Sequence, residues 1–355
     1  MTDLTTFLKA TGNEWAAIAD EGIAAGDVSG YYDTGSYTLN ALISGSIYGG
    51  IPDSKATGFA AESSVGKTML ALSTLKQFLD MKPNGLAMIF ESESAISRQM
   101  LVDKGIDVTR VGIVPCTTLQ DFRNSCIKVI DNYEKTKEKD RVPLFFMLDS
   151  LGMLSTEKEV ADALAGNNVK DMTRASLVRS VFRVITLKLG RARIPFAITN
   201  HVHANVTAMY GGNEVSGGGG FKYACSTIIT MTKAQDKDGD EIRGAIVTCT
   251  AYKSRLTREK LKVKTRILHR GGLDRYYGLV PLAEAAGVLK KVSTRMEFVD
   301  DGTKAFESVI NKDPKKYWTQ ERLDQIEKYV KTHFLYVSDT DIDELPPEIV
   351  ADDEA

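Results

Sequence analysis

Short apolar runs alternate with longer segments of mixed character between about residues 39 and 282. The runs are rich in branched and aromatic side chains, which is typical of strands buried inside a sheet. They cover residues 57–60, 86–90, 111–114, 144–148, 196–199, 227–231 and 245–251. Helical spacing of apolar residues marks the segments 69–79, 119–135 and 172–189. This alternation predicts an α/β fold with a mainly parallel central sheet flanked by helices.

The two ends of the chain differ from this central part. We expect residues 1–36 to form a short N-terminal segment and residues 37–290 to form the core. The composition then turns polar, so residues 291–337 predict a small C-terminal region with one more helix near 320–334. Residues 338–355 hold eight acidic residues and no Lys or Arg, a composition typical of a disordered, solvated tail.

Composition limits the functions that are open to the chain. Its 43% hydrophobic and 26% charged residues are typical of a globular protein, and the net charge of −2 means that nucleic acid must bind to a local basic patch. The four cysteines share no spacing of a metal site or a disulfide framework. Neither a signal peptide nor a long apolar run is visible, so we expect a cytoplasmic protein without a membrane partner.

Residues 61–68, with the sequence AESSVGKT, match a phosphate-binding loop except that Ala61 replaces the first glycine. A predicted strand precedes this loop and a predicted helix follows it, so backbone N–H groups and the positive helix end face the phosphates. Lys67 adds a positive charge, and the Thr68 hydroxyl is placed to bind Mg²⁺. The loop predicts a nucleoside triphosphate site formed by Glu62, Ser63, Ser64, Val65, Gly66, Lys67 and Thr68.

Polar residues end three of the predicted strands. Asp149 follows the run 144–148 and is expected to hold magnesium through its water shell. Glu91 and Glu93 follow the run 86–90 on the same side by strand alternation, so either could be the base that deprotonates water. His201 closes a further strand, where it either senses the γ-phosphate or is a structural histidine.

Two further segments of the sequence are candidate binding segments. Residues 202–220 contain six glycines and no apolar periodicity, which indicates a binding loop after a core strand. Residues 253–270 contain eight Lys or Arg and one acidic residue, and part of this segment alternates like a strand with one basic face. Lys253 and Arg255 stand apart because they follow directly on the predicted strand 245–251.

The order of these motifs resembles the RecA-type homologous recombinases, most of all their phage UvsX-type branch, from about residue 34 to residue 292. The motifs are Glu62-Ser63-Ser64 with Gly66-Lys67-Thr68, Glu91-Ser92-Glu93, Leu148-Asp149-Ser150-Leu151, Thr199-Asn200-His201, the glycine-rich segment and Lys253-Ser254-Arg255. The resemblance implies a RecA-like ATPase core that polymerises as a helical filament on single-stranded DNA. It implies ATP-dependent strand exchange with homologous duplex DNA in recombination, repair and replication, with a single-strand-binding protein and a loader or mediator protein as further partners. If a phage encodes the protein, it acts in the cytoplasm of the host cell.

The resemblance also assigns roles to residues. It makes Glu93 the hydrolytic base, Lys67, Thr68 and Asp149 the phosphate and magnesium ligands, and His201 the γ-phosphate sensor. Lys253 and Arg255 would reach across the filament interface to the ATP of a neighbouring subunit. Met100 stands where an aromatic residue often covers the adenine.

Two DNA loops are implied at about residues 155–170 and 203–221. The residues expected to contact DNA in or beside them are Lys158, Lys170, Arg174, His203, Asn205, Met209, Tyr210, Gly211, Gly212, Gly217, Gly218, Gly219, Gly220, Phe221 and Lys222. Near the N-terminus, Phe7 and Ala10 form an F-x-x-A pattern that could dock one subunit onto the next.

Two alternatives share the same core motifs. One is a RecA-fold hexameric helicase, although 36 residues are too few for the helical N-terminal domain that such proteins carry. The other is a recombination-accessory paralogue that binds ATP only for assembly, which the intact Lys67, Glu93 and Asp149 argue against.

Overall fold

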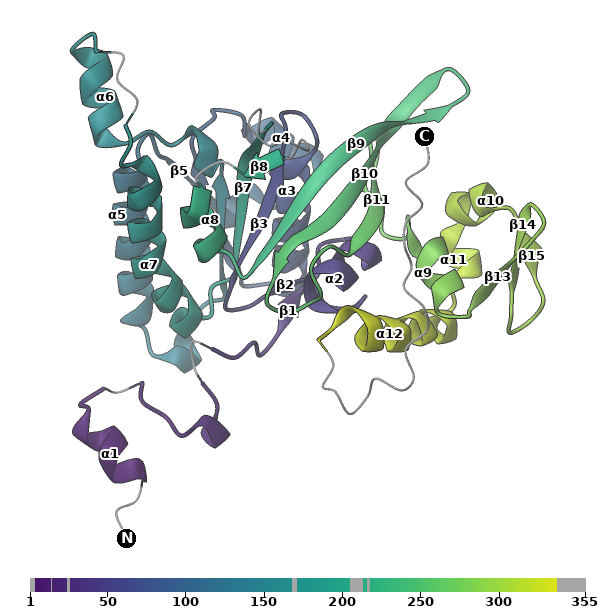
Figure 1. Ribbon diagram of the computed structural model, residues 1–355, viewed down its shortest axis with the longest axis horizontal. Coiled ribbons are helices and arrows are strands. Elements are labelled where there is room, and N and C mark those ends of the chain that lie inside the picture. Colours follow the sequence, from purple (N-terminus) through teal and green to yellow (C-terminus); the bar gives the residue numbers. More distant parts are fainter. Residues whose placement is uncertain are drawn as a thin grey trace.

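The computed structural model describes residues 4–13, 15–23, 26–167, 171–204, 213–215 and 218–336 (Figure 1). Its main feature is one large sheet with the strand order β12-β11-β10-β9-β3-β7-β6-β4-β5, to which β8 adds by pairing with β7. The strands are β3 (Ala56–Ala61), β4 (Leu86–Glu91), β5 (Val111–Pro115), β6 (Leu144–Asp149), β7 (Phe196–Ala204), β8 (Asn213–Val215), β9 (Thr227–Asp238), β10 (Glu241–Ser254), β11 (Lys262–Leu268) and β12 (Gly272–Leu273).

The sheet has a parallel half and an antiparallel half. Strands β9, β3, β7, β6, β4 and β5 are parallel neighbours, whereas β10, β11 and β12 continue the sheet beyond β9 in antiparallel order. The mainly parallel α/β fold is therefore confirmed. The long hairpin formed by β9 and β10 projects beyond the helices in Figure 1.

Helices cover both faces of the sheet, so apolar side chains on both faces of its central strands are buried. On β6, Phe145 and Met147 belong to one hydrophobic cluster, while Phe146 and Leu148 belong to the other. The first cluster lies under α2 (Tyr37–Ser44), α3 (Lys67–Met81) and α4 (Arg98–Asp103). The second lies under α5 (Leu119–Glu134), α7 (Arg174–Ala192) and α8 (Gly218–Ala224).

The part of the chain after β12 packs onto the first of these clusters. It contains α9 (Leu279–Ala285), β13 (Leu289–Val292), β14 (Arg295–Phe298), β15 (Lys304–Ala305), α10 (Glu307–Lys312), α11 (Pro314–Tyr317) and α12 (Gln320–Phe334). The buried side chains of Phe298, Trp318 and Val330 belong to the same cluster as α2 and α3. Glu327 also accepts hydrogen bonds from the Ser46 hydroxyl and the Ile47 N–H, so α12 is fixed to the end of α2 by polar contacts as well.

The remaining elements are short. They are α1 (Leu4–Ala10), β1 (Tyr31–Tyr32), β2 (Ile51–Pro52), α6 (Glu157–Leu164) and the 3₁₀ helices Ala19–Glu21, Val108–Arg110, Glu138–Asp140 and Leu151–Met153. Helix α1 lies apart from the sheet in Figure 1 and has no buried residue. In the part of the chain that the structure describes, no helix combines the length and the apolar character needed to cross a membrane.

Candidate functional site

The predicted phosphate-binding loop connects the end of β3 to the start of α3. Gly66 has a φ of 118°, and a Cβ atom placed there would lie 2.6 Å from Cδ1 of Ile267, so the loop needs glycine at this position. Ala61 is the last residue of the extended strand, where a side chain brings no conformational penalty. This explains why the first glycine of the sequence pattern is dispensable here.

The ammonium group of Lys67 lies against the same loop. Its Nζ donates hydrogen bonds to the carbonyl oxygens of Ala61, at 3.2 Å, and Glu62, at 2.8 Å. Burial lowers the pKa of Lys67, and the charges of Glu93 and Asp149 act in the opposite direction. The loop therefore holds a cationic group at the start of α3, where the helix end itself attracts anions.

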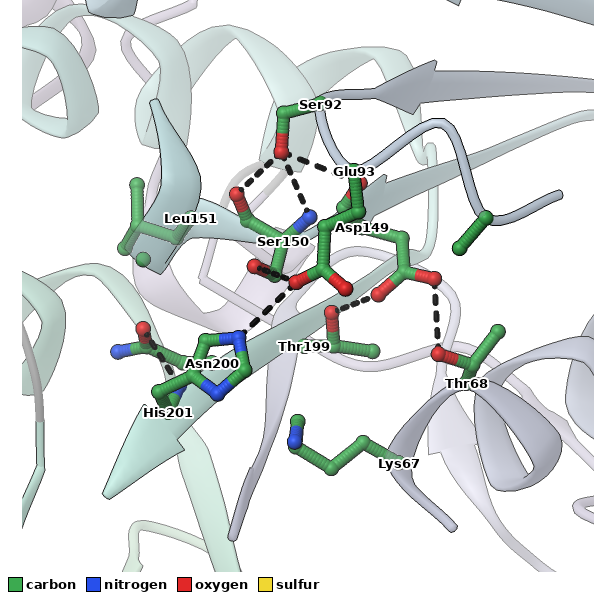
Figure 2. A network of polar contacts seen from close by, with 12 residues as sticks. Lys67, Thr68, Ser92, Glu93, Asp149, Ser150, Leu151, Thr199, Asn200 and His201 are labelled. Carbon is green, nitrogen blue, oxygen red and sulfur yellow. Dashed lines mark hydrogen bonds and ion pairs between the residues drawn. The ribbon is translucent and has the colours of Figure 1, made fainter. Parts of the chain in front are cut away.

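Parallel pairing brings the polar ends of three neighbouring strands to the same edge of the sheet. Glu91 is the register partner of Asp149, and Ala61 is the register partner of His201. Figure 2 shows the result, in which side chains from β6, β7, the loop after β4 and the start of α3 point toward one another. The structure thus brings together the candidate nucleotide residues that the sequence places far apart.

Asp149 joins two hydroxyl groups at this edge. Its Oδ2 accepts a hydrogen bond of 2.8 Å from the Thr68 hydroxyl, and its Oδ1 accepts one from Thr199. Asp149 is only 1% exposed, and burial raises the pKa of its carboxyl group, although the two hydroxyl donors lower it in part. A positive ion beside Oδ2 would relieve the cost of burying this charge.

The donors present fit magnesium bound together with a nucleotide. Thr68 and Asp149 offer neighbouring oxygen atoms, the ligand type that Mg²⁺ prefers. Among the described residues, no group of three or more His, Cys, Asp or Glu side chains is placed to hold a metal ion. Phosphate and water oxygens would therefore complete the coordination, as is usual for Mg²⁺ at phosphate sites.

Glu93 lies in the loop after β4, and its side chain has polar partners from two other segments. Its Oε1 accepts a hydrogen bond from the Ser150 hydroxyl and lies 2.9 Å from Nε2 of His201. Burial raises the pKa of this carboxyl group, but the hydrogen bonds from Ser150 and His201 and the charge of Lys67 lower it overall. Glu93 is therefore held ionised at neutral pH, the state that a general base requires.

Glu91 has a different environment, so the two carboxylates that the sequence could not separate are distinguished by their contacts. Strand β4 ends at Glu91, and the alternation expected to continue to Glu93 stops there. The Glu91 side chain is buried, and its Oε1 accepts hydrogen bonds from the backbone N–H groups of Glu93, at 3.1 Å, and Ala95, at 2.8 Å. Glu91 thus shapes the turn that carries Glu93.

Met100 lies on α4, near the core but not in it. Its side chain is partly buried against the cluster that α3 also covers, and its backbone N–H is bonded to the side chain of Ser97 at the helix start. The remaining loop residues Glu62, Ser63 and Ser64 are exposed, whereas Val65 is buried. The loop therefore presents its polar residues outward and anchors itself through Val65.

Lys253 and Arg255 have unlike surroundings, although both were expected to reach a neighbouring subunit. Lys253 Nζ donates hydrogen bonds to the carbonyl oxygens of Lys222 and Cys225, at and just after the end of α8. Its pKa is lowered, first by burial and then by the charge of Arg255. Arg255 is exposed and forms no ion pair within the described ranges. Of the two, Arg255 is the one with an exposed side chain.

Arg255 also lines a hollow that the sequence did not indicate. The hollow measures about 420 Å³ and is lined by Arg179, Phe182, Arg183, Thr186, Tyr223 and Arg255. Arg179 and Arg183 are one turn apart on α7, and the guanidinium of Arg179 lies 5.5 Å from the ring centroid of Tyr223. Arginines four residues apart in the segment 172–189 were the available signal, but such pairs are common on solvated helices.

The residues expected to contact DNA are only partly described. Lys158 lies on α6, and the N-terminal end of α7 carries Arg174, whose guanidinium donates to the carbonyl oxygens of Leu151, Gly152 and Leu154. Lys222 stacks over the Tyr252 ring. His203 lies on β7, and Gly218, Gly219 and Gly220 lie on α8. The predicted DNA contacts that lie outside the described residues are Lys170, Asn205, Met209, Tyr210, Gly211, Gly212 and Gly217.

Phe221 is among the predicted DNA contacts, but the structure places its side chain in the core. The side chain is completely buried in the cluster beneath α7 and α8. It packs so closely on β3 that a Cβ atom on Gly58 would lie 2.5 Å from its ring. Gly220 is equally close to α7, since a Cβ there would lie 2.8 Å from the Val178 side chain. The end of the glycine-rich segment therefore forms part of the core.

A phosphate-binding loop, a Thr–Asp pair and a carboxylate on adjacent parallel strands define the class of P-loop nucleotide-binding proteins. Comparison with known proteins narrows this class. The family model described as the RecA N-terminal domain matches residues 19–274. The chain therefore belongs to the RecA family, and the resemblance noted in its motifs is confirmed.

Individual relatives agree with this membership. The chain is 31% identical over 268 residues to the "Recombination and repair protein" of Enterobacteria phage T4, which spans 75% of this chain and 67% of that protein. It is 26% identical over 264 residues to "Protein RecA" of Thermus aquaticus, covering 74% and 73% of the two chains. It is 22% identical over 290 residues to "Protein RecA" of Chlorobium chlorochromatii, covering 80% and 78%.

Proposed function

We propose that this protein is an ATP-dependent recombinase that forms helical filaments on single-stranded DNA and exchanges strands with homologous duplex DNA. The observation that carries the proposal is the convergence of Thr68, Asp149 and Glu93 beside the phosphate-binding loop of a RecA-family chain. Relatives named "Protein RecA" and "Recombination and repair protein" support the same reading. A single-strand-binding protein and a loader or mediator protein are the further partners we propose.

In this proposal the nucleotide site performs hydrolysis of ATP. Lys67 and the backbone N–H groups of the loop bind the phosphates, while Thr68 and Asp149 hold Mg²⁺, which offsets phosphate charge when bound. Glu93 accepts the proton of the water that attacks the γ-phosphorus, and the bond to the bridging oxygen of ADP breaks. Met100 lies beside the adenine in the bound state.

His201 acts as the sensor of the γ-phosphate. It contacts Glu93 and lies on β7, the strand that leads into the glycine-rich segment. A change in the charge near Glu93 would therefore alter the His201 contact and, through β7, the start of that segment. This supports a role for residues 203–221, apart from the buried Phe221, together with residues 155–170, as the DNA-binding part of the protein.

In our proposal, two separate parts of the chain take part in assembly. Arg255 reaches the ATP of the neighbouring subunit, and Lys253 supports the strand end that carries Arg255. Phe7, with 61% of its surface exposed, and Ala10 lie on a helix without buried residues, which suits docking onto a second copy of the chain. We assign residues 1–36 to this docking segment and residues 37–290 to the ATPase core. Residues 291–337 form the C-terminal region, and residues 338–355 form an acidic tail.

Electron microscopy of negatively stained protein with single-stranded DNA and a non-hydrolysable ATP analogue tests the proposal. Helical filaments would support a recombinase, whereas closed rings would favour the hexameric helicase that shares these motifs. A strand-exchange assay with homologous and heterologous duplexes separates the recombinase from an accessory paralogue. Filaments that neither hydrolyse ATP nor exchange strands would favour the accessory protein.

A further inference from the structure

Strand β9 carries a lysine to the outer side of the phosphate-binding loop. Parallel pairing between β9 and β3 ends at Thr230 and Ala60, so β9 continues past the point where β3 gives way to the loop. The exposed Lys233 lies on this continuation, and its Nζ donates a hydrogen bond of 2.6 Å to the carbonyl oxygen of Ser64. The side chain of a neighbouring strand is thereby fixed to the loop backbone.

The direction of this hydrogen bond determines where the next N–H group points. Ser64 has a φ of 62°, in the left-handed region that a serine adopts only when its surroundings hold it there. The Ser64–Val65 peptide is trans, so its C=O and N–H groups point in opposite directions. With the Ser64 carbonyl turned toward Lys233, the Val65 N–H points away from Lys233.

We propose that Lys233 is a positioning residue for nucleotide binding, and this inference rests on the proposed function. The ammonium group holds the Ser64–Val65 peptide in the orientation that directs the Val65 N–H at a phosphate oxygen. It also polarises that peptide, because a positive charge at the C=O makes the N–H of the same unit a stronger donor. Lys233 thus acts on the phosphates through the loop backbone.

No acidic side chain competes for this ammonium group in the described part of the chain, where Lys233 forms no ion pair. Lys237 provides a matched control because it lies on the same strand, is also exposed and carries the same charge. Removing either lysine changes the net charge equally. Only Lys233 contacts the loop, so a difference between the two variants reports the contact and not the general field of the protein.

The test is the affinity of the full-length protein for mant-ADP with MgCl₂ and without DNA, measured by fluorescence. We expect Lys233→Met to weaken binding about three- to tenfold, the effect of losing one charge-assisted hydrogen bond at an exposed site. Lys233→Arg keeps a cationic donor and should bind within about twofold of the wild type. Lys237→Met should match the wild type at each salt concentration. In DNA-stimulated hydrolysis, Lys233→Met should raise KM for ATP and leave kcat unchanged.

Three results would overturn the inference. Lys233→Met could bind mant-ADP like Lys237→Met, or Lys233→Arg could be as weak as Lys233→Met. Alternatively, Lys233→Met could lose affinity for single-stranded DNA alone, which would make Lys233 a direct DNA contact. Failure of the wild-type protein to bind mant-ADP would instead refute the proposed function itself, so the two failures are distinguishable.

Discussion

The Nε2 atom of His201 lies 2.9 Å from Oε1 of Glu93, the same carboxylate oxygen that accepts a hydrogen bond from the Ser150 hydroxyl. One oxygen atom therefore receives contacts from the residue that follows β6 and from a residue of β7. Both contacts favour the ionised form of Glu93 and compete with water for its lone pairs. A base held in this way becomes effective once a water molecule on the γ-phosphate takes over part of its hydrogen bonding.

Replacing this carboxylate should separate nucleotide binding from hydrolysis. Glu93→Gln keeps the size of the side chain but removes the base, so we expect turnover to fall by about 10²- to 10⁴-fold with affinity for mant-ADP retained. Glu91→Gln should hydrolyse ATP at close to the wild-type rate, because an amide oxygen can still accept the backbone N–H groups of Glu93 and Ala95. An inactive Glu91→Gln beside an active Glu93→Gln would reverse the assignment.

Asp149 should oppose folding at neutral pH. Burial raises its pKa in the folded state, so the folded protein binds a proton at this group more readily than the unfolded chain does. The resulting penalty is absent below about pH 4, where both states are protonated, and grows as the pH rises through the folded-state pKa.

Asp149→Asn should therefore raise the melting temperature of the nucleotide-free protein at pH 8 above that of the wild type. The gain should disappear as the pH approaches 4. The same variant should lose magnesium-dependent hydrolysis. Differential scanning calorimetry across this pH range provides the measurement, and a lower melting temperature at pH 8 would contradict the prediction.

The sequence predicted the elements that are buried on both faces or clearly amphipathic. Strands β3, β4 and β6 and helix α12 lie where their apolar patterns placed them. Helix α2 was missed because every residue from Tyr37 to Ser44 is buried, which leaves no polar face to reveal its period. Strands β13 to β15 were missed because each has only two to four residues, too few for a clear alternation.

For the candidate site too, only the residues that belong to a local sequence pattern could be predicted. The phosphate-binding loop and Asp149 follow from local patterns, because each adjoins a strand end that the sequence makes visible. The choice between Glu91 and Glu93 depends on where β4 stops, which alternation alone does not fix. Lys233 and Arg179 were missed because their importance comes from what lies across the fold, namely Ser64 and Tyr223.

Phe221 should matter for stability. Because its ring is completely buried, we expect Phe221→Ala to reduce the free energy of unfolding by about 3–5 kcal/mol. Tyr223→Ala removes a ring that is 66% exposed and should cost less than about 1 kcal/mol. Urea denaturation followed by circular dichroism measures both. If Phe221→Ala unfolds like the wild type and yet fails to bind single-stranded DNA, the result would support a direct contact between Phe221 and DNA.

Arg255 should act on the ATP of a neighbouring subunit. Its exposed charge has no partner ion in the described part of its own chain, whereas Lys253 supports the end of α8 and would disturb that helix if replaced. Arg255→Ala alone is therefore the cleaner variant. We expect it to bind mant-ADP normally as an isolated subunit but to lose DNA-stimulated hydrolysis, because that activity requires the completed interface.

Mixing two inactive variants tests whether the arginine works in trans. Lys67→Ala removes the phosphate-binding lysine but keeps Arg255, and Arg255→Ala has the opposite defect. In a mixed filament, some junctions join an intact loop to an intact arginine, so hydrolysis should reappear on single-stranded DNA and be greatest near equal proportions. A mixture of Lys67→Ala with Glu93→Gln is the matched control, because both variants are defective in the same half-site and no junction is restored. If co-assembly is shown by crosslinking and no activity returns at any ratio, Arg255 does not act across the interface.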